Sequence, residues 1–180
     1  KQLSAKKSYY RQQALQAGDL TPAEQLFRQP LSRNPNSPEA LSNLGAIFAR
    51  RQQFAEAVVF YQKALKADSN LVPVHFNLAI ALGQLKAYDK AVQHLRTFLL
   101  TYPREARARQ LLGLALIENG DLRGALAELE TSYKLNPGDG SILYALAQAN
   151  ARAGDVDRAA QLLRQSQINP VQGKLIEGLI

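Results

Sequence analysis

Two histidines, His75 and His94, are the residues of this chain best suited to metal or proton chemistry. They stand nineteen positions apart and are expected on different helices. Zinc sites combine three or four ligands, and their paired histidines are usually about four residues apart, which this spacing does not allow. Cysteine is absent, which also removes thiolate nucleophiles, cysteine zinc ligands and disulfides. We therefore interpret both histidines as packing or surface residues and predict no metal site.

Asp155 and Asp157 form a close pair of carboxylates, of the kind that general acid–base catalysis requires. They stand where a turn leads into a helix, and an aspartate at that place accepts hydrogen bonds from free backbone amides. No nucleotide-binding glycine loop and no GxSxG nucleophile motif occurs. We therefore predict no catalytic residue and no cofactor, and we interpret the chain as not an enzyme.

The net charge of +7 raises the question of an acidic or nucleic-acid partner. Residues 4–37 hold five basic and two acidic side chains, whereas residues 106–139 hold four and five. The excess lies toward the amino end and forms no run of like charges, which is more typical of a solvated surface. Nucleic-acid binding is the weaker alternative. A hydrophobic content of 46% is typical of a globular protein, and no apolar run approaches the roughly 18 residues of a membrane span.

A fixed period of 34 residues organises the elements that would position any site. Stepping by 34 from Ala57 gives an alanine at every equivalent place: Ala23, Ala57, Ala91, Ala125 and Ala159. The same step relates Tyr61 to Phe27, Leu95, Leu129 and Leu163, and it relates Gly45 to Ala79, Gly113 and Ala147. Within each period, apolar residues recur at helical intervals in two segments. The pattern predicts a helix pair per repeat, with the small residues at the crossing of the two helices.

The 34-residue period and the sequence segments within it resemble the tetratricopeptide repeat family. The matching segments are NLGAIF at 43–48, LLGLAL at 111–116, GDLTPAEQLF at 18–27 and GDLRGALAEL at 120–129. The resemblance implies an all-α fold, a right-handed superhelical solenoid of stacked antiparallel helix pairs in one domain over residues 1–180. We expect five 34-residue repeats, at 4–37, 38–71, 72–105, 106–139 and 140–173, with 174–180 as a partial sixth repeat or a cap.

The two ends of the chain depart from the regular frame. Pro30 stands inside an expected second helix, where proline removes a backbone hydrogen bond, so we predict a kink or break between Leu26 and Pro30. Repeat arrays need polar end faces to stay soluble. We expect residues 174–180 either to begin a further repeat of a longer array or to dock as a cap, and an uncovered end face to pair two copies.

In tetratricopeptide arrays the first helix of each pair lines a concave groove. The resemblance places Asn43 and Asn77 there, at equivalent positions, and a side-chain amide offers both a donor and an acceptor to a peptide backbone. Solvated asparagines are the alternative reading. The apolar floor beside them is expected to be formed by Phe76, Ile80, Leu111 and Leu114, unless the curl of the array covers these side chains. Arg50 and Arg107 are expected at the edges.

We therefore predict a protein-interaction module that binds a peptide or helix of another protein in this groove. The alternatives are a self-assembling scaffold that pairs through its end faces, and a regulatory arm of a larger enzyme. RNA binding by a repeat code would require polar readers at equivalent places, and Ile80 and Leu114 interrupt such a series. The richness in Arg, Gln, Ala and Leu favours a bacterial source, and cytoplasm and periplasm both remain open.

Overall fold

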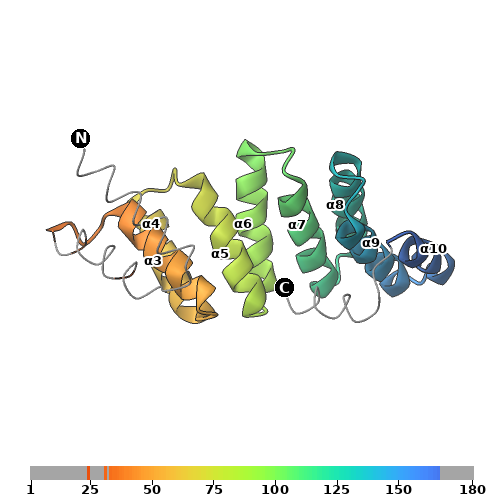
Figure 1. The fold of residues 1–180 in the computed structure, drawn as a ribbon, viewed down its shortest axis with the longest axis horizontal. Helices are drawn as coiled ribbons and strands as arrows, with labels where there is room; N and C mark the ends of the chain where they lie inside the picture. The colour runs from red at the N-terminus through yellow and green to blue at the C-terminus, as the bar shows by residue number, and fades with distance from the viewer. Residues whose placement is uncertain (1–23, 25–30, 32, 167–180) are drawn as a thin grey trace. The chain divides into compact units, whose positions relative to one another are not determined.

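The computed structural model describes residues 24, 31 and 33–166. Between Pro38 and Ser166 the chain forms eight α-helices and no β-strand (Figure 1). Their bounds are α3 Pro38–Arg50, α4 Phe54–Ala67, α5 Val72–Gln84, α6 Tyr88–Thr101, α7 Ala106–Glu118, α8 Leu122–Leu135, α9 Gly140–Arg152 and α10 Val156–Ser166. The predictions for the helix over 1–17, the kink near Pro30 and residues 174–180 lie outside the described residues.

The helices begin in strict register. The first helices begin at residues 38, 72, 106 and 140, and the second helices begin at 54, 88, 122 and 156, so each start is 34 residues from the next. Local sequence explains the starts. The Ser37 side chain accepts a hydrogen bond from the amide of Ala40, and Pro38 occupies the first helical position, where its missing N–H costs nothing. Asp121 and Asp139 cap α8 and α9 in the same way.

In the four repeats between residues 38 and 166, the turn between the two helices has the same conformation. Its central residue has a positive φ: 60° at Gln52, 57° at Lys86, 79° at Gly120 and 90° at Gly154. The following amide then bonds back across the turn, as from Gln53 to the carbonyl of Phe48 at 2.9 Å and from Asp121 to that of Leu116 at 2.9 Å. This is the Schellman arrangement that ends a helix and reverses the chain.

The chain divides into two compact units, Lys1–Ala81 and Leu82–Ile180, with the boundary inside α5. In the first unit, α3 packs against α4. In the second unit, α7 packs on α8 and α9 on α10, while the contacts of α6 with α7 and of α8 with α9 join consecutive pairs. The expectation of a single domain stays a prediction.

The small residues of the period lie in the helix crossings, as predicted. Ala57, Ala91, Ala125 and Ala159 are all buried, and so are their larger neighbours Tyr61, Leu95 and Leu129. At Gly113 an added Cβ would lie 2.5 Å from Cγ of Leu129 and 3.2 Å from the carbonyl oxygen of Ala125. Ridges pack into grooves this closely only where a side chain is missing. The close packing between α7 and α8 therefore explains why a small residue stands at this position of the period.

Candidate functional site

Asn43 and Asn77, the predicted peptide-binding amides, both lie in the first unit. Asn43 is half-buried on α3, and Asn77 is exposed on α5. Within the described part of the chain, neither side chain makes a hydrogen bond to the protein. An amide that the fold does not use keeps its donor and acceptor for a ligand.

Phe76 and Ile80, the predicted apolar neighbours of these amides, are half-buried on α5. Arg50, the predicted edge residue, is exposed in the last turn of α3. A half-buried aromatic side chain retains apolar area that a ligand can cover. These three residues and the two asparagines thus share one unit and remain accessible in part.

The other three predicted residues lie on α7 in the second unit. Arg107 is exposed and Leu111 is half-buried, whereas only 4% of Leu114 is exposed. Of the two readings left open by the sequence, the covered one applies to Leu114 in this structure. Its side chain belongs to the core, so Leu111 is the α7 leucine with apolar area left for a ligand.

The first helices α7 and α9 are in contact, and polar bonds tie them at both ends. Near their starts, Nε2 of Gln110 donates to Oγ of Ser141 at 2.9 Å. Near their ends, the guanidinium of Arg152 forms an ion pair with Glu118 at 2.7 Å and donates to the carbonyl oxygen of Ile117 at 3.4 Å. Two anchors about two helical turns apart fix the relative position of the two helices, so any groups on their shared surface are preorganised.

The charges of the Glu118–Arg152 ion pair also act on the pKa of Tyr88. Burial raises the pKa of Tyr88, and the negative charge of Glu118 raises it further, while Arg152 opposes the shift. Next to it, the amide of Asn119 donates to a carboxylate oxygen of Asp89 at 2.9 Å, which joins α7 to the start of α6. The Glu118–Arg152 ion pair and the Asn119–Asp89 hydrogen bond each join two helices. The charged groups of these contacts are therefore already used within the protein.

Sequence reasoning left two half-buried residues of α9 out of the predicted set. Tyr144 and Gln148 occupy the repeat positions of Phe76 and Ile80, two repeats further on. Their helix, α9, contacts α7, which carries Leu111. The 34-residue frame already assigns Tyr144 and Gln148 to the face of Phe76 and Ile80, because it relates equivalent positions, although the predicted contact set did not include them.

His75 and Asp155 were considered above as candidates for metal binding or catalysis, and the structure shows the surroundings of each. Burial lowers the pKa of His75, which favours its neutral form. A carboxylate oxygen of Asp155 accepts a hydrogen bond from the amide of Arg158 at 3.0 Å, which confirms its capping role. Among the described residues, no three His, Cys, Asp or Glu side chains come together as metal ligands would. Nor is any helix there long and apolar enough to cross a bilayer.

Family models for the tetratricopeptide repeat match residues 38–71, 76–139 and 111–171, which is most of the chain. The chain belongs to the tetratricopeptide repeat family. Membership makes it a protein-interaction scaffold, as tetratricopeptide proteins in general are.

Among curated proteins, the chain is similar to the cellulose synthase operon protein C of Xanthomonas axonopodis pv. citri, with 32% identity over 159 residues. That match covers 81% of this chain and 10% of the relative. It is also similar to the type IV pilus assembly protein PilF of Pseudomonas aeruginosa, with 29% identity over 135 residues, covering 74% of this chain and 54% of PilF. The chain therefore spans between a tenth and about half of the length of these relatives.

Two solved structures share the fold. MamA of Desulfovibrio magneticus RS-1 (residues 41 to the end) has a TM-score of 0.82 at 25% identity, over 91% of this chain and 96% of that one. YrrB, described as a tetratricopeptide protein with an unusual peptide-binding site, has a TM-score of 0.82 at 18% identity, over 94% and 89%. The predicted fold class, an all-α tetratricopeptide solenoid, is confirmed.

Proposed function

We propose that this tetratricopeptide protein is a non-catalytic module that binds an extended peptide or a helix of another protein along its first helices. The observation that carries the proposal is the pair Asn43 and Asn77, whose amides occupy equivalent repeat positions and form no hydrogen bond within the described part of the chain. Each amide can donate to a peptide carbonyl and accept from a peptide N–H. Their repeat spacing suits a ligand that runs from one repeat to the next.

Apolar contacts would supply the rest of the affinity. Phe76 and Ile80 in the first unit, and Leu111 in the second, each retain exposed area on a first helix. Arg50 and Arg107 would add charge contacts at the edges, which favours a ligand with acidic groups. Leu114 contributes by supporting the helix rather than by touching the ligand, because it is buried.

Preorganisation is the mechanism that this arrangement supports. The two ties between α7 and α9 hold the helices before a ligand arrives, so that binding would order little beyond the ligand itself. The description of YrrB as having a peptide-binding site is consistent with this use of the fold. No group of the described residues suggests a reaction for the protein to catalyse.

The test uses peptides selected on the wild-type chain from a displayed random library. The dissociation constant of a selected peptide is measured for the double variant Asn43→Ala/Asn77→Ala. Two lost amide contacts should raise it about tenfold or more, since each hydrogen bond contributes about 0.5–1.5 kcal/mol.

The matched control is Gln62→Ala/Gln93→Ala, which removes two exposed amides from the second helices α4 and α6. This variant should bind like the wild type, and thermal melting should show that both variants fold. Equal affinity for the wild type and the asparagine variant would sink the proposal.

A further inference from the structure

Helix α10 exposes apolar side chains at two positions that are buried or half-buried in the other second helices of the described residues. Leu163 is 43% exposed, whereas its repeat equivalents Leu95 and Leu129 are 2% and 0% exposed. Val156, at the start of α10, is 68% exposed. A second helix that exposes a residue whose repeat equivalents are buried has an unpartnered face.

The packing of the second unit explains the difference. Leu95 lies on α6, which is covered by α7, and Leu129 lies on α8, which is covered by α9. Among the described helices, α3 to α10, no helix comes after α10 in the chain and packs on it as α7 packs on α6. The exposed side of α10 thus continues a series of helix interfaces that the protein forms twice already.

The exposed residues form a narrow stripe. Ala159, Leu162 and Ser166 are the buried residues of α10, which packs on α9. Val156, Ala160 and Leu163 are spaced by four and three residues, so they lie in one row beside that buried face. Ala160, the small residue, is at the centre of the row.

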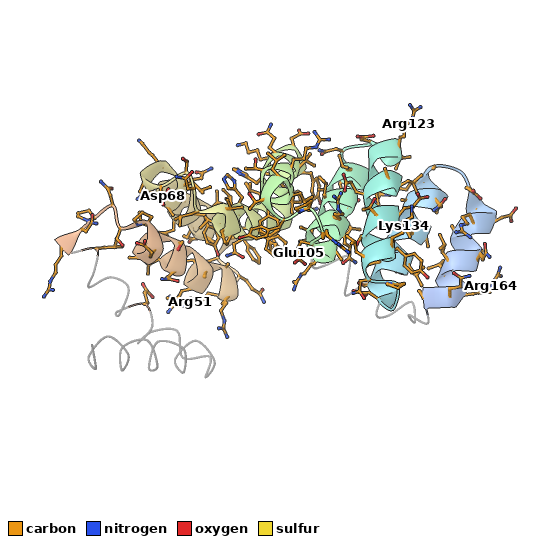
Figure 2. The ribbon with its side chains drawn as sticks, turned by 90° about the horizontal axis from the view of Figure 1, so that it is seen from above. Arg51, Asp68, Glu105, Arg123, Lys134 and Arg164 are labelled. Atoms are coloured by element: carbon orange, nitrogen blue, oxygen red, sulfur yellow. The ribbon has the colours of Figure 1, made fainter. Side chains whose placement is uncertain are left out.

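Charges border the stripe in a self-complementary order. Asp157 lies in the first turn of α10 and Arg164 in the last, seven residues apart on the same side of the helix. Figure 2 labels Arg164 on α10, where it extends outward from the helix. In the described part of the chain, neither side chain forms an ion pair or a hydrogen bond. Both charges are therefore available to a partner.

We propose that α10 docks antiparallel on α10 of a second copy of this chain. A two-fold axis near Ala160 brings the two small residues together, so that the helices approach closely. Val156 of one copy then lies against Leu163 of the other. The same symmetry brings Asp157 of each copy next to Arg164 of the other, which gives two ion pairs at the rim.

The size of the helix sets the expected strength. Eleven residues span about 16 Å, so the contact is smaller than the roughly 1,600 Å² of a standard stable interface. The dimer should therefore be weak and reversible, with a dissociation constant on the order of 10–500 µM. Peptide binding by the first helices is a separate property and does not depend on this contact.

Sedimentation equilibrium of the 180-residue chain, from about 10 µM to about 1 mM, tests the proposal. The wild type should pass from monomer to dimer within this range. Leu163→Glu places a charge in the stripe and should leave a monomer throughout. The matched control is Leu100→Glu, which changes an 85% exposed leucine on α6 and should dimerise like the wild type.

A charge exchange tests the antiparallel order. Asp157→Arg and Arg164→Asp should each weaken the dimer about three- to tenfold by placing like charges together, and the double variant should restore it. Circular dichroism at the working temperature shows that every variant is folded. A wild type that stays monomeric at 1 mM, a Leu163→Glu variant that still dimerises, or a double variant weaker than both single ones would each overturn the proposal.

Discussion

Gly45 faces the ring of Tyr61 so closely that a Cβ at position 45 would lie 2.7 Å from both Cδ1 and Cε1 of that ring. Tyr61 is buried and its ring cannot move aside. Gly45→Ala should therefore destabilise the first unit by about 1–3 kcal/mol, because overpacking outweighs the gain of about 1 kcal/mol in helix propensity. Denaturation in urea measures the change.

A second substitution separates overpacking from other effects of alanine. In the repeat of α5 and α6, the equivalent positions hold Ala79 and Leu95, both of which are buried, so the combination of alanine and leucine occurs in a packed repeat. The double variant Gly45→Ala/Tyr61→Leu should lose less stability than the sum of the two single changes. Strict additivity would mean that the contact between residues 45 and 61 is not the cause.

Lys86 holds a left-handed backbone conformation, with a φ of 57°, at a repeat position where the sequence has Gly18, Gly120 and Gly154. A side chain in this region costs about 1 kcal/mol relative to glycine. Lys86→Gly should therefore raise the free energy of unfolding by about 0.5–1 kcal/mol, measured by thermal or chemical denaturation. Gly120→Ala, at the equivalent turn with a φ of 79°, is the reverse experiment and should lower it by a similar amount. A loss of stability on Lys86→Gly would contradict the assignment of strain to this turn.

His75 should make the fold sensitive to mild acid. Burial lowers its pKa below the usual 6.5, so between these two values the unfolded chain binds more protons than the folded chain. This contribution to stability is intact above pH 6.5 and is lost as the pH falls through 6.5 toward the folded pKa. The unfolding free energy of His75→Leu should change less between pH 7.5 and 5.5 than that of the wild type. Leu41 and Leu143 show that leucine fits this repeat position. Parallel pH profiles for the two proteins would contradict the effect of burial.

Ser132 is fully buried on α8, and its hydroxyl donates to the carbonyl oxygen of Ala106 at 2.7 Å. The equivalent position in an earlier repeat is Ala64, also fully buried. Ser132→Ala should therefore cost no more than about 1 kcal/mol, the value of the lost hydrogen bond, because alanine fits the site. Ser132→Leu should cost about 1–3 kcal/mol or more by overpacking. Similar urea midpoints for the two variants would show that space at this crossing is not limiting.

The repeat frame could be predicted from the sequence because close helix crossings admit only small residues. Ala91 and Ala125 are buried where the period placed them, and Gly113 meets Leu129 as the equivalent positions imply. One restriction of this kind recurs in every repeat, so a single sequence holds several independent copies of the signal. Fold class and helix pairing follow from it directly.

The details of the candidate site depend on neighbours that a period does not specify. Leu111 and Leu114 are both leucines of α7 at expected groove positions, yet one is half-buried and the other is in the core. The ion-pair partner of a long charged side chain depends on local geometry, as in the ion pair of Arg152 with Glu118. The ion pair of Arg109 with Glu128 at 2.6 Å is replaced by Leu41 with Phe60 in one repeat and by Leu143 with Leu162 in another. In the repeat of α5 and α6 the same two positions hold His75 and His94. Such contacts depend on the three-dimensional arrangement of the side chains, which the repeat period does not specify.

The most direct test of peptide binding by the first helices is a titration of the ¹⁵N-labelled chain with a library-selected peptide. The side-chain amide resonances of Asn43 and Asn77 report on the proposed contacts, and those of Gln62 and Gln93 report on the second helices. We expect the two asparagine signals to shift with peptide concentration while the glutamine signals stay in place. Shifts confined to Gln62 and Gln93, with Asn43 and Asn77 unchanged, would contradict the account.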